Sequence, residues 1–317
     1  MSSQSIHNPP YPSRRYAWFV VFLLIIASLV AFMDRQIVAI VVGPMQRDLG
    51  VGDTQIGWLY GIHALFYAFA AIPIASLADT RSRKHIIAIG VFFWSLMTII
   101  CGLTKNYTQI FLARIGVGVG EATLTPSTTS LIGDYFPRED VPLAMSIFQA
   151  GPIIGTGIAF IVGGFVLQLV EGASPLVLPI IGELVPWQQT FLYLGVPGIL
   201  LAFVMLLIRE PVRRPSESKI EGATNTEELI AFYRDNSKTI IFHHIGNLSL
   251  LMTGFAFVFW SITFFVRVHD MDASHASQTF GWIYIFFGPL GPLLIAYFAK
   301  NQSQKGHYDA NMTAGML

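Results

Sequence analysis

The chain has 317 residues, of which 53% are hydrophobic and only 12% are charged. This charge content is about half that of an ordinary soluble domain, so the composition excludes a soluble globular protein and indicates a polytopic membrane protein. Acidic and basic residues both number 19, so the net charge does not point to a nucleic-acid partner and none is expected. The single cysteine, Cys101, excludes a disulfide framework and a cysteine-based metal site.

Apolar segments long enough to cross a membrane follow one another along most of the chain. A spanning helix needs about 20 apolar residues. No small-residue cleavage site follows the first such segment, so we expect it to remain as a spanning helix. We therefore predict an all-α polytopic membrane protein with about eight complete spans. Their approximate ranges are 17–42, 55–78, 85–104, 108–133, 142–170, 188–208, 240–266 and 278–299.

The distribution of basic residues predicts the orientation in the membrane. With the N-terminus in the cytoplasm, fourteen of the nineteen Lys and Arg residues lie on the cytoplasmic side. Three lie outside (Arg47, Lys105 and Arg267), and Arg35 and Arg114 lie within spans. This bias follows the positive-inside rule. We predict a multi-pass protein of the cell membrane, either plasma or inner membrane, with a cytoplasmic N-terminus.

A long polar segment divides the chain into two unequal parts. Residues 1–16 are predicted to form a cytoplasmic tail, and residues 17–208 a bundle of six transmembrane helices. Residues 209–239 read as a cytoplasmic linker that carries one short amphipathic helix at the membrane surface. Residues 240–317 would then form part of a second bundle, with two helices and the start of a third.

An internal repeat supports this division. Residues 74–84 close the second span, and residues 295–305 close the eighth with a related sequence, shifted by 221 positions. Two six-helix halves related by duplication are a common plan among transporters. Because only two helices of the second half are complete, we expect a C-terminally truncated transporter; an authentic eight-span protein is the alternative.

Acidic and basic residues interrupt two of the apolar spans. Asp34 and Arg35 lie in the first span, and Arg114 and Glu121 lie in the fourth. A charge at bilayer depth costs several kcal/mol, so such residues usually have a partner or a function. Two interpretations remain open: a structural ion pair that holds helices together, and a proton- or ion-coupled transport site.

Helical spacing places part of this set on one face. Arg114, Gly118 and Glu121 share one side of the fourth span, and Asp34 lies at about the depth of Arg114. We therefore expect Asp34 and Arg114 to meet if their helices are neighbours. A carboxyl that alternates between a desolvated setting and a guanidinium partner takes up and releases a proton. The hypothesis is that Asp34 and Glu121 exchange protons, with Arg35 and Arg114 as state-dependent partners.

Three further features have competing interpretations. His63, in the second span, either relays protons, contacts a polar substrate head or hydrogen-bonds to a neighbouring backbone. The glycines within 116–120 allow close helix packing rather than nucleotide binding, because no strand precedes them. Gly151, Pro152 and Gly155 predict a hinge in the fifth span, because proline removes a backbone hydrogen bond and glycine permits bending.

At this point the residues resemble a known family. Residues 75–84 are similar to the signature loop of the major facilitator superfamily, although Ala75, Thr80 and Ser82 replace its Gly, Arg and Gly. Within that superfamily, three segments resemble the spinster group, whose animal members are lipid and lysolipid transporters. These segments are residues 34–38 in the first span, residues 116–122 in the fourth span, and residues 134–137 after it.

The resemblance implies a fold and a set of roles. It implies twelve helices in two halves, with a substrate cavity between them and alternating access by rocking. It implies proton coupling for Asp34 and Glu121, and pairing of these acids by Arg35 and Arg114. It also implies a cytoplasmic gate loop, in which Asp79 lies against a helix end of the opposite half when the inside is closed. The gate-loop residues are Asp79, Arg83, Lys84 and Asp134.

We therefore predict a secondary active transporter, coupled to protons, for an amphiphilic or lipid-like organic molecule. An organic-anion/proton symporter is the alternative, in which Arg35, Arg114 and His63 would contact the substrate. A second alternative is a non-transporting membrane sensor or an inactive fragment. No catalytic constellation, cofactor motif or metal motif is present, so we expect no enzyme, cofactor or metal. We expect a monomer whose partners are the substrate, protons and the lipid bilayer. The substrate's identity and the direction of transport do not follow from the sequence.

Overall fold

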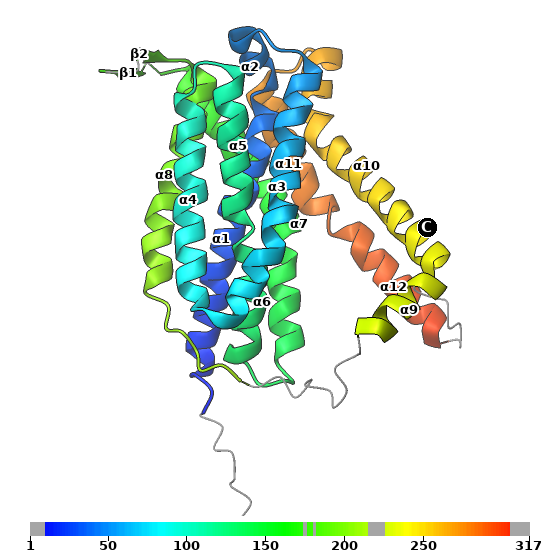
Figure 1. The fold of residues 1–317 in the computed structure, drawn as a ribbon. Coiled ribbons are helices and arrows are strands. Elements are labelled where there is room, and N and C mark those ends of the chain that lie inside the picture. The colour runs from blue at the N-terminus through cyan, green and yellow to red at the C-terminus, as the bar shows by residue number, and fades with distance from the viewer. Residues whose placement is uncertain (1–9, 174–175, 180–181, 215–225, 305–317) are drawn as a thin grey trace, which may run out of the picture.

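The computed structural model describes residues 10–173, 176–179, 182–214 and 226–304, and the part it describes is almost entirely helical (Figure 1). Its two short strands form an antiparallel hairpin between α7 and α8. The elements in chain order are α1 (Arg14–Ile40), α2 (Val42–Leu49), α3 (Asp53–Thr80), α4 (Arg83–Leu103), α5 (Tyr107–Glu121), α6 (Leu124–Tyr135), α7 (Val141–Glu171), β1 (Leu176–Leu178), β2 (Gly182–Leu184), α8 (Pro186–Leu206), α9 (Thr226–Asp235), α10 (Ser237–His269), α11 (Ala273–Phe287) and α12 (Leu290–Gln304).

Six of the helices are each long and apolar enough to cross a membrane: α1, α3, α4, α7, α8 and α10. The fourth and eighth predicted spans differ from expectation, because each is a pair of helices (α5 with α6, α11 with α12) rather than one continuous helix. A proline lies at or just after each break. Pro126 cannot donate the backbone hydrogen bond to Ala122, and Pro289 likewise ends the ladder of α11.

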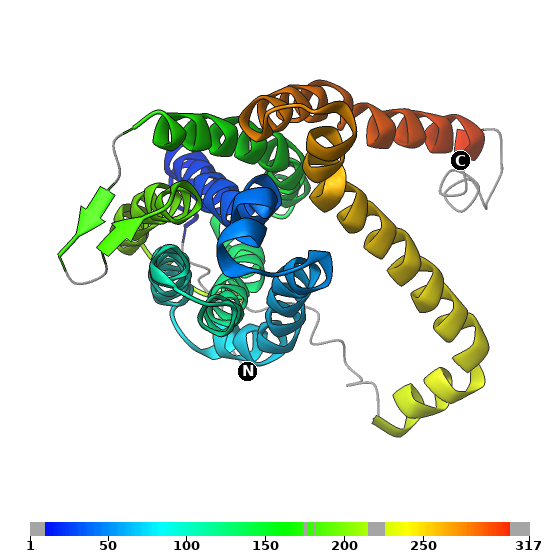
Figure 2. The same ribbon diagram turned by 90° about the horizontal axis from the view of Figure 1, so that it is seen from above.

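The N-terminal bundle consists of α1, α3, α4, the α5–α6 pair, α7 and α8 (Figures 1 and 2). We call the end at which α1 begins the lower end of the bundle, and the end at which α1 finishes the upper end. The core is mostly apolar, and its largest fully buried side chains include Trp94 and Trp187. Burial of apolar side chains between helices of this kind gives the bundle a close-packed interior.

Helix α11 packs along α7 and joins the second half of the chain to the first. Gly157 and Gly281 lie against each other at the crossing: a Cβ built on Gly281 would come within 2.7 Å of the Gly157 carbonyl oxygen. The Ser277 hydroxyl also donates a hydrogen bond of 2.7 Å to the carbonyl of Phe160. Small residues let these two backbones approach closely.

Helix α10 contacts the bundle near its upper end, and α10 and α12 both extend away from the bundle toward the lower end (Figure 1). Figure 2 shows the same two helices from above, diverging from the bundle. The rings of Tyr60 on α3 and Phe259 on α10 lie 4.5 Å apart, centroid to centroid. At the upper end, Arg267 of α10 forms an ion pair of 2.6 Å with Asp53 of α3. Most large apolar side chains of the lower half of α10 are exposed.

These features confirm the predicted all-α fold, with a complete six-helix N-terminal bundle and a partial second bundle. The helices α10 and α11–α12 lie at positions shifted by about one repeat from α1 and α3, as the sequence repeat indicates. A short helix, α9, lies within the predicted linker and leads into α10. The residue boundaries of the four predicted segments stay a prediction, and residues 305–317 lie outside the described part.

Candidate functional site

Helices α1 and α5 bring a cation and an acid together in the interior of the bundle. The Nε of Arg35 lies 2.6 Å from Oε2 of Glu121 and donates a hydrogen bond to it. The Glu121 side chain is fully buried, whereas 21% of the Arg35 side chain is exposed. The pair therefore has a buried acidic side and a partly accessible basic side.

Helix α3 adds a third titratable group to this pair. The Nε2 of His63 lies 3.2 Å from the same Oε2 atom of Glu121. The other oxygen of Glu121, Oε1, has no hydrogen-bond partner among the described residues. The sequence left three interpretations of His63 open. Its contact with Glu121 is compatible with the interpretation as a proton relay.

The glycines of α5 explain why these side chains meet. A Cβ built on Gly118 would lie 2.4 Å from the backbone oxygen of His63, so only glycine lets α3 approach α5 at this point. Gly116 and Gly120 face the other way, toward Met97 and Trp94 of α4. Alternate glycines therefore let α5 fit between two helices, which confirms the interpretation of this segment as a packing motif.

Asp34 and Arg114 also meet, but not in the way that the sequence suggested. The Nη1 of Arg114 donates a hydrogen bond of 2.9 Å to the backbone carbonyl of Asp34, not to its carboxylate. Both residues are fully buried. The two carboxylate oxygens of Asp34, and Nε and Nη2 of Arg114, have no hydrogen-bond partner within the described part of the chain. The expected contact at equal depth is present, and the expected carboxylate–guanidinium hydrogen bond is not.

A cavity of about 410 Å³ lies beside the Arg35–Glu121 pair, between the bundle and helices α10 and α11. Its polar lining includes Arg35 and Gln36 from α1 and Tyr60 from α3. Its apolar lining comes largely from α10: Leu250, Leu251, Phe255, Phe257 and Val258. The cavity thus has a cationic and polar side facing an apolar side.

Aromatic rings hold the Arg35 guanidinium at the edge of this cavity. Its central carbon lies 5.1 Å from the ring centroid of Phe32 and 4.8 Å from that of Tyr67. The Tyr67 hydroxyl lies 3.1 Å from the hydroxyl of Thr125, just after the break between α5 and α6. These cation–π contacts restrict the position of the guanidinium. Arg114, by contrast, is fully buried and does not line the cavity.

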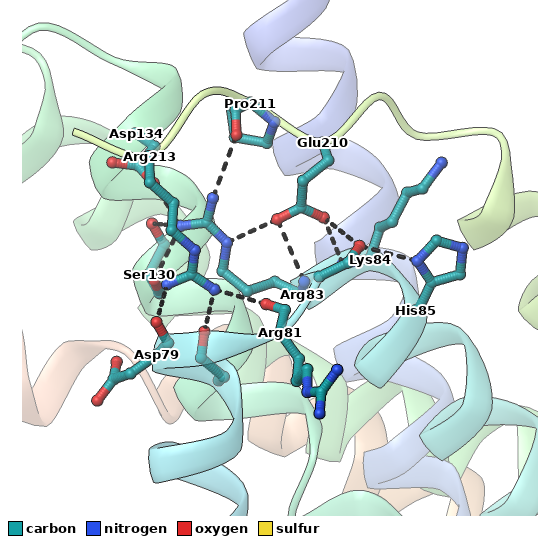
Figure 3. Close-up of polar contacts among 12 residues, drawn as sticks. Asp79, Arg81, Arg83, Lys84, His85, Ser130, Asp134, Glu210, Pro211 and Arg213 are labelled. Carbon is teal, nitrogen blue, oxygen red and sulfur yellow. Dashed lines mark hydrogen bonds and ion pairs between the residues drawn. The ribbon is translucent and has the colours of Figure 1, made fainter.

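The gate-loop residues form a second charge cluster at the lower end of the bundle (Figure 3). Arg83 is almost fully buried and forms ion pairs with Asp134 and with Glu210, the latter at 2.8 Å. It also donates to the Ser130 hydroxyl at 2.9 Å and to the backbone of Pro211. Arg83 therefore joins the start of α4, the end of α6 and the segment that follows α8.

Glu210 and Arg213 complete this cluster by capping two helix ends. Glu210 accepts hydrogen bonds from the Ser82 hydroxyl and from the backbone N–H groups of Arg83 and Lys84, at the start of α4. Burial raises the pKa of Glu210, but these hydrogen bonds and the Arg83 guanidinium outweigh it, so its pKa lies below the ordinary value. Arg213 donates to the backbone carbonyls at the end of α3: Ala78, Asp79 and Arg81.

The other predicted gate and hinge residues have less specific contacts. The Asp79 carboxylate points away from the arginine cluster (Figure 3). Within the described part of the chain, the Lys84 ammonium donates to the carbonyl of Leu206, at 3.5 Å. Pro152 lies inside the continuous helix α7, and Gly151 and Gly155 on the same helix face α1. These positions are compatible with a gate and a hinge, and both roles stay predictions.

Several cavity and cluster residues were not singled out from the sequence: Gln36, Tyr60, Tyr67, Glu210 and Arg213. The signal for Glu210 and Arg213 was present, since both follow the sixth span on the same predicted side as residues 75–84. Gln36 lies in the segment 34–38 that resembles the spinster group, but Tyr60 and Tyr67 gave no comparable signal, because uncharged polar side chains are ordinary in membrane helices. Within the described ranges, no group of three or more His, Cys, Asp and Glu residues could hold a metal ion.

The helical bundle, its buried charges and the cavity between its halves define a multi-pass membrane protein of the transporter class. The sequence model of the family described as "Major Facilitator Superfamily" matches residues 24–306, so the chain belongs to this family. Within it the chain is spinster-like, which confirms the predicted resemblance.

Three comparisons illustrate the relationship. The chain is 32% identical to the sphingosine-1-phosphate transporter SPNS2 of Danio rerio, over 81% of this chain and 49% of that protein. It is 24% identical to the probable L-galactonate transporter of Escherichia coli strain K12, over 90% of this chain and 62% of the relative. The crystal structure of a bacterial homologue of the human lysosomal transporter spinster, inward-facing and unoccupied, matches with a TM-score of 0.76 and 27% identity, over 93% of this chain and 64% of that chain. The chain thus spans between about half and two thirds of these proteins. Because they are transporters, the prediction that the chain is not an enzyme is confirmed.

Proposed function

We propose that the chain acts as a secondary active transporter, coupled to protons, that carries an amphiphilic or lipid-like organic molecule by alternating access. The cavity beside Arg35 is the substrate site, and Glu121 with His63 and Asp34 forms the proton site. The protein works as a monomer in the cell membrane, with the lower end and the N-terminus in the cytoplasm.

The observation that carries this proposal is the shared position of Arg35. Its guanidinium lines the cavity and at the same time forms an ion pair with Glu121. A substrate anion that binds Arg35 from the cavity competes with Glu121 for the same cation. When the substrate wins, the buried carboxylate loses its cation, and burial then favours its protonated form. Substrate binding and proton uptake are thereby linked.

The lining of the cavity, which is polar on one side and apolar on the other, supports an amphiphilic substrate. The Arg35 side suits an anionic head group, whereas the α10 side offers Leu250, Leu251 and Phe255 to an apolar chain. Cavities for organic ligands usually combine a mostly apolar lining with a few placed polar groups.

The arrangement of the two halves supports alternating access. At the upper end α3 and α10 are joined by Arg267 and Asp53, whereas the lower parts of α10 and α12 extend away from the bundle (Figure 1). Closing the lower end would bring the second half toward Asp79 and the Arg83 cluster, which we propose as the cytoplasmic gate. Bending of α7 at Gly151, Pro152 and Gly155 would accompany this movement.

The proton site is tested by replacing Glu121 with glutamine, which keeps the shape of the side chain and removes its charge. The assay measures uptake of a fluorescent single-chain phospholipid into proteoliposomes under an imposed pH gradient. We expect the wild-type chain to respond to the gradient and the Glu121→Gln variant to lose that response. The exposed Glu139→Gln serves as the control. A gradient response that persists unchanged in Glu121→Gln refutes proton coupling through this residue.

One observation favours the second candidate, symport of a small organic anion with protons. The Escherichia coli relative is named as a probable L-galactonate transporter, and a sugar acid of that kind is an organic anion without an apolar chain. Arg35 would bind its carboxylate; Arg114 is too deeply buried to do so in this conformation. Uptake of labelled L-galactonate and of the phospholipid, each measured against pH and membrane potential, separates the two candidates.

A further inference from the structure

Helix α4 carries polar side chains on the face that it turns toward Asp34 of α1. Trp94, Thr98 and Cys101 follow one another at helical spacing, and all three are fully buried. The indole N–H of Trp94 and the hydroxyl of Thr98 lie beside the Asp34 carboxylate. Neither group reaches hydrogen-bonding geometry with a partner in the described part of the chain. A buried donor without a partner costs free energy, so two such donors beside one carboxylate require an explanation.

Other threonines show how a threonine hydroxyl is satisfied within the helices of this fold. Four of them donate to the backbone carbonyl four residues earlier, at 2.9 Å in each case: Thr129, Thr156, Thr190 and Thr253. Thr98 does not form this bond, although the carbonyl of Trp94 lies at the same spacing. Its hydroxyl is therefore available to the carboxylate of Asp34.

Asp34 has the acceptors that these two donors need. Both of its carboxylate oxygens are buried and have no hydrogen-bond partner among the described residues. Arg114 does not supply one, because its Nη1 donates to the backbone carbonyl of Asp34 instead. A rotation of the Asp34 side chain toward α4 would satisfy the carboxylate and both donors together. The ionised carboxylate gains more from this than the protonated form, because hydrogen bonds to a charged group are stronger.

The charged and titratable groups around Asp34 leave room for neutral donors to have a measurable effect. These groups are Arg35 on α1, His63 on α3, Cys101 on α4, and Arg114 and Glu121 on α5. A nearby cation favours an ionised carboxylate and a nearby anion opposes it, so Arg114 and Glu121 act on Asp34 in opposite senses. Helices α7 and α8, which also pack on α1, carry no charged residue or histidine between their ends.

We propose that Trp94 and Thr98 are positioning residues of the proton site, which hold the ionised Asp34 carboxylate against α4 by donating hydrogen bonds to it. The inference rests on the proposed function, in which Asp34 belongs to the proton site. Protonation of Asp34 weakens both bonds and frees its side chain to leave α4. Proton uptake is thereby coupled to the contact between α1 and α4.

The test follows the protonation of Asp34 by infrared spectroscopy of the 317-residue chain in lipid nanodiscs, as the pH is varied. The carbonyl band of the protonated Asp34 carboxyl is assigned by its loss in Asp34→Asn. In Thr98→Val the midpoint of this band should move to higher pH by about one unit, because the ionised form loses a donor. Trp94→Phe should move it in the same direction. Thr98→Ser keeps the hydroxyl and should restore the wild-type midpoint.

Thr128→Val is the matched control. The Thr128 hydroxyl on α6 is also fully buried and has no partner in the described part of the chain, but it does not lie beside Asp34. We expect this variant to keep the wild-type midpoint. An equal shift in Thr128→Val, or an unchanged midpoint in both Thr98→Val and Trp94→Phe, refutes the inference. So does a shift that persists undiminished in Thr98→Ser.

Failure of the proposed function gives a different result. Uptake into proteoliposomes then shows no response to the pH gradient, while the Asp34 band still moves in Thr98→Val. In that case the contact of α4 with Asp34 stands and its link to transport does not. If Asp34→Asn removes no band at any pH, Asp34 does not take up a proton, and the inference fails together with the assignment of Asp34 to the proton site.

Discussion

The two charge clusters of this protein differ in how completely their hydrogen bonds are satisfied. At the lower end, Arg83 bonds to Asp134, Glu210, Ser130 and a backbone carbonyl, and Glu210 in turn caps α4. In the interior of the bundle, Arg35 pairs with one oxygen of Glu121, and the other oxygen has no partner among the described residues.

This difference suits the two clusters to different roles, one that stabilises a fixed arrangement of helices and one that permits an exchange of partners. A fully satisfied network stabilises one arrangement of helix ends, because any rearrangement leaves several groups without partners. An incompletely satisfied pair loses less when it exchanges one partner for another. The lower cluster thus joins α3, α4 and α6 in one arrangement, whereas the interior cluster loses less on rearrangement, as the proposed coupling to substrate and proton requires.

The largest expected effect comes from removing the centre of the satisfied cluster. Arg83→Ala leaves Asp134 and Glu210 without their shared cation, and loss of one partner from a buried pair costs about 3–5 kcal/mol. Thermal unfolding of the purified chain in detergent measures the loss. Arg81→Ala is the matched control, since the Arg81 side chain is exposed. Equal unfolding temperatures for the two variants would show that the lower cluster does not stabilise the bundle.

The next effect tests how the interior cluster is positioned. In Gly118→Ala the new methyl group meets the backbone of His63, and overpacking of this kind costs about 1–3 kcal/mol. Gly133→Ala on α6 is the control, because a Cβ there meets nothing within 4 Å. Unfolding temperatures of both variants provide the measurement. A Gly118→Ala variant as stable as Gly133→Ala contradicts the close approach of α3 and α5.

The sequence singled out the charges inside the spans, but it did not predict how they pair. Asp34, Arg35, Arg114 and Glu121 stand out because ionisable residues in apolar spans are rare. Their pairing depends on the rotation of α1 about its axis, and consecutive residues such as Asp34 and Arg35 point about 100° apart. Spacing within one helix does not determine that rotation, so the preference of Glu121 for Arg35 came only from the structure.

For the lower cluster, the sequence predicted the gate-loop residues but not Glu210 and Arg213. Residues 75–84 resemble a family signature, and this drew attention to Asp79, Arg83 and Lys84. Glu210 and Arg213 lie in a charged segment that reads as an ordinary polar linker. Long-range pairing between a loop and a linker more than a hundred residues away leaves no periodic signal in the sequence. The helix breaks near Pro126 and Pro289, by contrast, follow from local chemistry and were open to prediction.

A smaller effect concerns the pH dependence of the lower cluster. The pKa of Glu210 lies below its ordinary value in the folded chain, so its contribution to stability is present above the ordinary pKa. That contribution is lost as the pH falls through the lowered folded-state pKa. The unfolding temperatures of wild type and Glu210→Gln, measured from neutral to acidic pH, should therefore converge at low pH. A constant difference at all pH values would show that the Glu210 charge is not responsible.

The smallest effect is expected at the upper end, where Arg267 and Asp53 join α10 to α3. The pair is close, at 2.6 Å, but about half of each side chain is exposed, 47% for Arg267 and 52% for Asp53. Exposed ion pairs of this kind contribute about 0.2–1 kcal/mol. A double-mutant cycle with Arg267→Ala and Asp53→Ala, read by thermal unfolding, gives their coupling energy. A coupling well above this range would mean that charge holds the upper end closed; a coupling within it leaves that task to packing, such as the contact of Tyr60 with Phe259.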